Sequence, residues 1–312
     1  MLDVRRLRLL RELAQRGTIA AVAQALAYTP SAVSQQLAAL EKEAGVPLLE
    51  RTGRSVRLTP AAVRLADHAE TILAVLEQAS AELATGRTEL TGTLRIGAFP
   101  TAVRTILSPA LVALSRDHPG LELLVSELDP VNAPAALRAE SLDIALVQEY
   151  DYVPAAPETG LDTEPFLEET IYLAAPTPEP LAEHRDSLWI AGMPGTLCHL
   201  MTVRACEAVG FTPRIRHHAD DFGTVLALVA AGQGVALVPE LGALNIPGGV
   251  ALVPLSTRRR TRLAYRRGTG SHPDVAGPPP PPRAGAPPPG AGPARAALHA
   301  SCATLPSRQA AE

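Results

Sequence analysis

Hydroxyl and amide side chains gather where one expected helix begins, at Pro30. Thr29 can accept hydrogen bonds from the first free backbone N–H groups, and the fixed φ of Pro30 suits the first helical position. Val33, Leu37 and Leu40 follow at spacings of four and three and form one apolar stripe. Mainly off that stripe, near the helix start, lie Ser31, Ser34, Gln35 and Gln36. Such side chains can read base edges and phosphates in the major groove of DNA, although a solvated polar face would show the same pattern.

A basic hairpin is expected directly behind this helix. After Gly45, the segment VPLLERTGRSVRLT contains two short extended runs with a turn at Gly53. Val56 and Leu58 alternate with Arg57, so one face can rest on the helices while the other meets phosphate. With a short helix at 20–26 before them, these elements predict a winged helix-turn-helix in residues 1–59. We expect its DNA contacts at Thr29, Pro30, Ser31, Ser34, Gln35, Arg51 and Arg54.

The stretch TIAAVAQALAYTPSAVSQQLAALEKEAGVPLLERTGRSVRLTPA resembles the helix-turn-helix of the LysR-type transcriptional regulators. The residues that carry the resemblance are Ser34 in the recognition helix, the pair Leu40 and Glu41, Gly45, Leu48, and Arg51 in the wing. It extends without a gap to about residue 85. Many members have Gln-Pro where Pro30 and Ser31 stand, Arg where Gln35 stands, and Gly where Ala62 stands. These departures concern which bases are preferred.

One long helix is expected after the wing, from residue 60 to about residue 85. Apolar residues recur in it at alternating spacings of four and three: Leu65, Ala69, Ile72, Leu76, Ala79 and Leu83. This spacing is typical of a coiled-coil seam and predicts a homodimer through residues 60–86, although an ordinary core helix is the alternative. A dimer would bind double-stranded DNA with a dyad-symmetric operator. The resemblance implies the same linker helix, often with assembly to a tetramer, and leaves contact with RNA polymerase open.

Strands and helices alternate from residue 92 to about residue 270. Short apolar runs at 94–98, 121–128, 143–147, 171–175, 187–191 and 235–239 are separated by helical segments. This order predicts an α/β domain with a parallel sheet between helices. The segment DDFGTVLALVAAGQGVALVPE resembles the effector-binding domain of the same family. The resemblance implies two lobes like those of periplasmic binding proteins, joined by crossovers near 159–164 and 256–263, with a small-molecule effector between them.

Residues that could hold the effector follow from the ends of the expected strands. Ligands of open parallel sheets collect at the carboxyl ends of strands, near helix N-termini. The residues at these places are Phe99, Pro100, Thr101, Gln148, Gly195, Thr196 and Phe222. Thr101 and Thr196 are the leading candidates, with simple helix capping as the alternative reading. Glu149, Asp220 and Asp221 could favour a cationic group, although acidic helix caps are common.

The sequence contains few features that would indicate an enzyme or a metal site. The segment 232–234 lacks the third glycine of a dinucleotide loop, and no G-x-S-x-G or phosphate-binding lysine loop occurs. His217 and His218 lack partners at ligand spacing. Cys198, Cys206 and Cys302 form no C-x-x-C pair and indicate reduced thiols. We therefore expect neither an enzyme, nor a cofactor, nor a metal site.

The charge distribution singles out the N-terminal segment for contact with DNA. Residues 1–60 contain nine Lys or Arg against five Asp or Glu, whereas residues 61–257 contain ten against twenty-five. Only the first segment combines positive charge with a folded reading module. The chain has no stretch of about 20 apolar residues and no apolar leader at its N-terminus, so we expect a cytoplasmic protein without a membrane span.

The sequence divides into four expected parts. These are a winged helix-turn-helix at 1–59, a linker helix at 60–90, an effector domain at 91–272, and a Pro/Ala/Gly-rich tail at 273–312. The lobes of the effector domain are expected at 92–162 plus 257–272, and at 163–256. The dense proline predicts a disordered tail, native or the product of a shifted reading frame. The predicted function is operator binding under effector control; a ligand-independent architectural DNA binder is the alternative.

Overall fold

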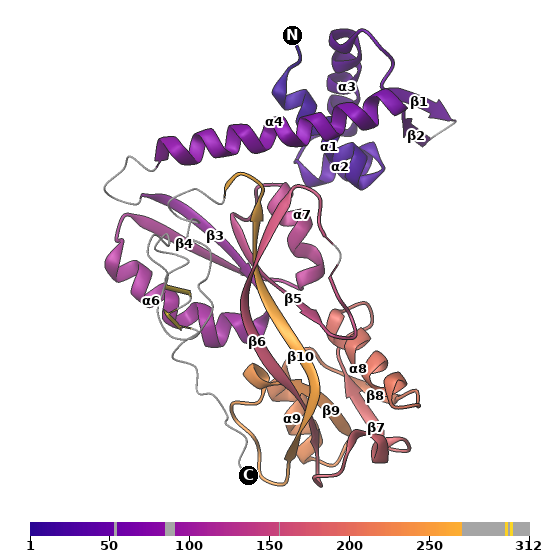
Figure 1. Cartoon of the computed structure of the whole chain (residues 1–312), viewed down its shortest axis with the longest axis vertical. Helices are drawn as coiled ribbons and strands as arrows, with labels where there is room; N and C mark the ends of the chain where they lie inside the picture. The colour runs from indigo at the N-terminus through magenta and orange to yellow at the C-terminus, as the bar shows by residue number, and fades with distance from the viewer. Residues whose placement is uncertain (53–54, 85–90, 156, 270–296, 299, 302–312) are drawn as a thin grey trace.

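A computed structural model of the chain describes residues 1–52, 55–84, 91–155, 157–269, 297–298 and 300–301. A compact helical module at the N-terminus is followed by one long helix, which crosses one end of a larger α/β domain (Figure 1). The fold class predicted from the sequence is confirmed. Among the described residues, no helix is long and apolar enough to cross a membrane.

The N-terminal module is a three-helix unit with a two-stranded wing. Its elements are α1 (Val4–Arg16), α2 (Ile19–Ala25), α3 (Pro30–Ala44), β1 (Leu49–Thr52) and β2 (Ser55–Leu58). Leu10, Leu37 and Leu40 are buried at its centre. Gly17 and Gly45 end α1 and α3 in the left-handed conformation, which costs glycine little. The predicted turn at Gly53 lies outside the described residues.

The long helix α4 (Pro60–Ala84) divides its apolar residues between two environments. Ala69 is fully buried in the core of the N-terminal module, and Leu65 packs against the same core. Of these two members of the predicted seam, Ala69 is therefore not available to a second chain, and Leu65 is partly covered by its own module. Ile72, Val75 and Leu76 are exposed farther along the helix. The exposed stripe starts at Ile72 and not at Leu65, about two turns later than the sequence pattern predicts, because the first half of α4 completes the module on which it rests.

The α/β domain is built on one eight-stranded sheet in the order β4-β3-β5-β10-β6-β9-β7-β8. The strands are β3 (Gly92–Ala98), β4 (Leu121–Glu127), β5 (Ile144–Tyr150), β6 (Leu161–Ala175), β7 (Leu188–Ala191), β8 (Arg214–His218), β9 (Val235–Pro239) and β10 (Ala251–Arg266). The main helices are α5 (Pro100–Ala102), α6 (Ser108–Asp117), α7 (Ala133–Arg138), α8 (Leu197–Ala208) and α9 (Phe222–Ala230). A π-helical turn, Val103–Leu107, joins α5 to α6.

Two long strands connect the lobes, and the expectation of a purely parallel sheet is wrong at these strands. β6 and β10 run side by side through both lobes (Figure 1) and are antiparallel to each other. β10 is also antiparallel to β5, and β6 to β9. The sequence pattern indicated only 171–175 of β6, because Glu164, Pro165 and Glu168 interrupt its apolar character. The lobe limits predicted at 162 and 256 fall inside these strands.

Part of the proline-rich tail departs from the predicted disorder. Residues 297–298 and 300–301 are helical, and Leu298 is fully buried in the core of the first lobe. The local sequence AALHAS contains good helix formers and no proline, which permits a turn of helix. The other residues from 270 onward lie outside the described part of the chain.

The first lobe touches the N-terminal module and α4 directly. Arg8 of α1 forms an ion pair with Glu140 at 2.9 Å, and Arg266 lies 3.5 Å from Glu77 of α4. Gly268 has a φ of 92°, and a Cβ there would overlap the backbone carbonyl of Ala74. A glycine is therefore required at this close approach.

Candidate DNA-reading surface and effector cleft

The start of α3 presents the predicted reading residues to solvent. The Thr29 hydroxyl accepts a hydrogen bond from Ala32 N–H at 3.2 Å, which fixes the first turn. Thr29, Pro30, Ser31 and Gln35 are exposed. Ser34 is half-buried, and its hydroxyl donates to the carbonyl of Pro30 at 2.9 Å. These residues share one end of one helix, an arrangement that a major groove can accept.

Glu41 of α3 fixes the wing by its carboxylate. One oxygen, Oε1, accepts hydrogen bonds from Leu48 N–H at 2.8 Å and from Leu49 N–H at 3.0 Å. Thr59 closes the other end of the wing, because its hydroxyl donates to the carbonyl of Pro47 and accepts from Ala62 N–H. Arg57 is exposed on β2. The side chains of Arg51 and Arg54 lie outside the described part of the chain.

A cleft with a cavity volume of about 270 Å³ lies between the two lobes. Its walls come from both lobes and from β10: Phe99, Pro100, Thr101, Glu127, Leu128, Asp129, Pro130, Gln148, Thr196, Cys198, Asp220, Phe222 and Arg259. The predicted effector residues therefore come together here, with the exception of Gly195, which is exposed and does not line the cleft. A concave, mostly apolar site with a few polar groups is typical of small-molecule binding.

The two leading threonines have different roles. Thr196 caps α8, because its hydroxyl accepts from His199 N–H at 3.3 Å and donates to the carbonyl of Met193 at 2.8 Å. The Thr101 hydroxyl instead accepts from Arg259 at 3.2 Å and lies at the floor of the cleft. Thr101 is thus the better placed of the two to hold a ligand.

Arg259 is the central residue of the cleft, and sequence reasoning missed it. Its side chain is only 1% exposed, and Nε donates to the carboxylate of Glu169. Nη1 donates to Gln148 Oε1 at 3.1 Å, and the guanidinium lies 4.8 Å from the centre of the Phe99 ring. Burial opposes the charge of Arg259, but the charge of Glu169 and its hydrogen bond contribute to a net rise in the Arg259 pKa. The guanidinium is therefore a permanent cation with a paired carboxylate.

Strand pairing explains why these charges meet. In the register of the sheet, Arg259 stands directly opposite Glu169 on β6 and opposite Tyr150 on β5. Thr257, Arg259 and Thr261 are buried, whereas the intervening arginines point outward. The alternation in STRRRTR is a signal that could have revealed an inward arginine. Outward-facing Arg260 pairs with Asp151 at 2.6 Å and with Glu168 at 3.1 Å.

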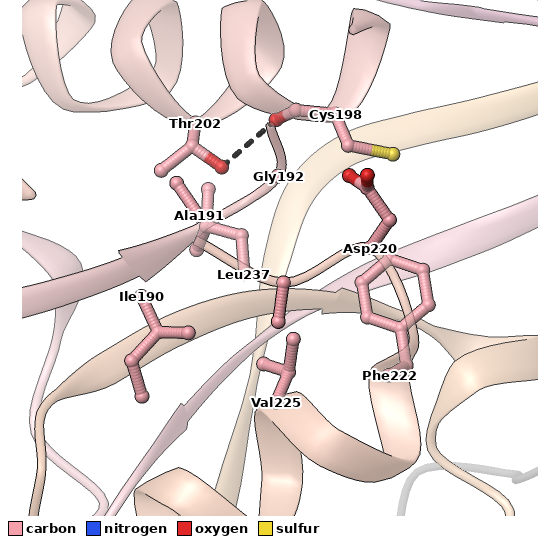
Figure 2. A pocket seen from close by; sticks show the side chains of 10 residues that line it. Ile190, Ala191, Gly192, Cys198, Thr202, Asp220, Phe222, Val225 and Leu237 are labelled. Carbon is pink, nitrogen blue, oxygen red and sulfur yellow. Dashed lines mark hydrogen bonds between the residues drawn. The ribbon is translucent and has the colours of Figure 1, made fainter. Parts of the chain in front are cut away.

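Cys198 lies where the cleft meets the second lobe. Its sulfur is 3.3 Å from the hydroxyl of Tyr150. Burial is the main cause that raises the pKa of Cys198; the Tyr150 hydrogen bond and the charge of Arg259 lower it, and the carboxylates of Asp129 and Asp220 raise it further. Figure 2 shows Cys198, Asp220 and Phe222 together at one edge of a small hollow of about 10 Å³. No group of three or more His, Cys, Asp or Glu side chains within the described ranges could hold a metal ion.

Comparisons with known proteins match both domains of the chain. Residues 4–63 match the model described as bacterial regulatory helix-turn-helix protein, lysR family, and residues 87–276 match the LysR substrate binding domain. The chain is 30% identical over 282 residues to a probable hydrogen peroxide-inducible genes activator of Mycobacterium avium, covering 85% of this chain and 89% of the relative. It is 29% identical over 248 residues to the transcriptional dual regulator GltC of Bacillus subtilis, covering 77% and 81%.

Solved structures share the fold. The structure of a full-length OxyR variant from Pseudomonas aeruginosa has a TM-score of 0.56 at 22% identity, with 87% of this chain and 91% of that chain covered. The structure of an OxyR mutant from Corynebacterium glutamicum has a TM-score of 0.50 at 27% identity, with 85% and 86% covered. The likeness therefore extends over the N-terminal module and the two-lobed domain.

Proposed function

Because the chain belongs to the LysR family of DNA-binding transcriptional regulators, which are not enzymes, we propose that α3 and the wing read an operator whose occupancy is set by a ligand in the inter-lobe cleft. The observation that carries this proposal is the presence of an exposed polar helix start and a two-lobed cleft on one chain. A ligand that binds the closed lobes better than the open ones would shift their population. Its site of action on DNA implies a cytoplasmic protein.

The DNA contacts are proposed to be Thr29, Pro30, Ser31, Ser34 and Gln35 on α3, with Arg51 and Arg54 in the wing. The test is a titration of the full chain against the DNA upstream of its own gene, at two salt concentrations and with random competitor. Gln35→Ala should relax sequence preference, whereas Arg51→Ala should weaken binding to all sequences and lower the salt slope by about 1. Lys42→Ala, at the exposed far end of α3, is the matched control. Unchanged operator binding in both variants would contradict this docking.

The exposed stripe of α4 is proposed to form a homodimer. Val75 is 60% exposed and Leu76 45% exposed, and Ile72 lies one turn earlier on the same side. Two copies would present two reading helices to a dyad-symmetric operator, and pairs of dimers would form a tetramer. Val75→Asp with Leu76→Asp should give monomers by light scattering. Val112→Asp, at an exposed apolar position on α6, should leave the mass unchanged.

The effector contacts are proposed to be Phe99, Pro100, Thr101, Gln148, Thr196 and Phe222, while Gly195 shapes the loop before α8. Thr101→Val keeps the side-chain volume and removes the hydroxyl. We expect it to abolish the effect of the effector on operator binding without changing operator affinity in the absence of effector. Operator binding that no metabolite alters would instead favour the ligand-independent architectural protein.

A further inference from the structure

The cleft holds carboxylates from both lobes that have no ion-pair partner among the described residues. Glu127 ends β4 and Asp129 follows it in the first lobe, and Asp220 precedes α9 in the second. Asp129 Oδ1 accepts from Val131 N–H and Asp220 Oδ1 accepts from Met193 N–H, both at 2.9 Å. The second oxygen of each group remains for another donor. The adjacent Asp221 differs, since Arg104 of the first lobe lies 3.6 Å from it.

The guanidinium of Arg259 is already paired with a carboxylate of its own, Glu169. Its Nε donates to that carboxylate, while Gln148 and Thr101 accept from its other nitrogens. The face of the guanidinium is covered by Phe99. An anionic ligand at this guanidinium would share it with Glu169, and it would also face three carboxylates on the cleft wall.

Asp129 from the first lobe and Asp220 from the second both line the cleft beside Cys198. Burial is the largest cause that raises the pKa of the Cys198 thiol; the Tyr150 hydrogen bond and the charge of Arg259 lower it, and Asp129 and Asp220 raise it further. Beside them, Phe222 offers an aromatic surface, and Asp220 and Phe222 lie next to each other in Figure 2. Carboxylates next to an aromatic ring suit an ammonium group attached to an apolar body.

We propose that the effector is a small organic cation, a protonated amine, whose ammonium group lies between Asp129 and Asp220 and whose apolar body contacts Phe222. This inference rests on the proposed function of the cleft. Like charges on facing lobes disfavour closure, and a cation between them reverses the sign of that interaction. Binding and closure are thereby linked, as effector control requires.

The test compares ligands of equal length that differ in charge. The full chain is heated with C3–C6 alkylamines and diamines, with the corresponding alcohols, and with the corresponding carboxylates, at constant ionic strength. The amines should raise Tm by roughly 4 °C or more at saturation, whereas the alcohols and carboxylates should not. The responding amine should also change operator affinity.

Isosteric variants then locate the site. Asp129→Asn and Asp220→Asn can keep the Val131 and Met193 contacts through the remaining amide oxygen, so the fold should survive. Each should weaken amine binding at least about tenfold, whereas Glu179→Gln, at an exposed position outside the cleft, should not.

The two proposals fail in different ways. Stabilisation by carboxylates, or amine binding that survives both Asn variants, would overturn the cationic effector and leave effector control in place. A lack of response to all three series, with intact operator binding, would overturn the cationic effector and favour the architectural protein. Absence of selective operator binding would contradict the proposed function whatever the amines do.

Discussion

Within residues 1–69 the fully buried side chains are chiefly leucines and other apolar groups, whereas the effector cleft has a guanidinium and a carboxylate at its centre. In the reading module, Leu10, Leu37 and Leu40 come from helices that are neighbours along the chain. In the cleft, Arg259 bonds to Thr101, which lies 158 residues earlier. The module also buries the charged Glu12, but its partners Arg11 and Arg16, at 2.8 and 2.7 Å, are neighbours on the same helix. One region is therefore fixed by local contacts, mostly apolar, and the other by charges brought together over long distances.

This difference bears on how each region can respond to a ligand. An apolar core tolerates changes of charge at the surface and lets the module act as a rigid reading head. A buried ion pair adds little net stability but becomes costly when one partner is removed. Arg259 and Glu169 face each other on the two strands that join the lobes, so the pair lies where a change in lobe position would be transmitted.

The largest expected effect is the loss of Arg259. Arg259→Met leaves the Glu169 carboxylate, 2% exposed, with the Leu241 N–H at 2.8 Å but without its cationic partner. We expect a loss of about 3–5 kcal/mol in the free energy of unfolding, measured by urea denaturation. Adding Glu169→Leu should recover much of that loss, because the unpaired charge is then gone.

The neighbouring strand position supplies the control. Arg260→Met removes an outward guanidinium that is 40% exposed and should cost no more than about 1 kcal/mol. Equal losses of unfolding free energy in Arg259→Met and Arg260→Met would mean that the buried arginine contributes no more to stability than the surface one.

The next effect concerns the apolar core of the first lobe. Leu298→Ala should cost about 2 kcal/mol in unfolding free energy, since a fully buried leucine leaves a cavity. Val112→Ala, at a position 72% exposed on α6, should change stability by less than about 0.5 kcal/mol. If Leu298→Ala changes the unfolding free energy as little as Val112→Ala does, the tail does not contribute to this core.

A smaller and more local effect is expected in the wing. Glu41→Ala removes the acceptor of Leu48 N–H and Leu49 N–H and should cost about 1–2 kcal/mol. Amide hydrogen exchange at Leu48 and Leu49 should accelerate and operator affinity should fall, while ligand binding in the cleft stays unchanged. Glu50→Ala, on the exposed side of β1, should leave both amides protected. A change in the cleft would argue against an independent reading module.

The same contrast explains what the sequence could predict. The helix start at Thr29 and Pro30, the apolar stripe of α3 and the basic hairpin are all patterns within a few residues, and they predicted the module. The ends of strands can be recognised locally, which is why Thr101 and Gln148, which line the cleft, were among the predicted residues. These signals require no knowledge of which strands pair.

Features that depend on strand pairing or on helix packing could not be predicted from the sequence. The alternation in STRRRTR is compatible with one inward arginine, but Arg259 is placed in the cleft only when β10 is set between β5 and β6. The length of β6 was hidden by Pro165 and its flanking glutamates. The buried role of Ala69 depends on α1, which packs against the first half of α4.

The smallest expected effect lies at the rim of the cleft, where Arg104 and Asp221 pair across the lobes while both are about half exposed. The pKa of Asp221 is lowered first by the Thr224 backbone N–H and least by Arg104. A lowered pKa means that Asp221 stabilises the fold above its unfolded pKa and loses that contribution as the pH falls through its folded value. Arg104→Gln should therefore cost only about 0.2–1 kcal/mol and leave the acid profile nearly unchanged, whereas Asp221→Asn should flatten it. The cost should vanish in high salt, as it does for exposed pairs. If the loss of stability in Arg104→Gln persisted in high salt, the Arg104–Asp221 pair at the rim would resemble the buried Arg259–Glu169 pair. Both pairs would then hold the two lobes together.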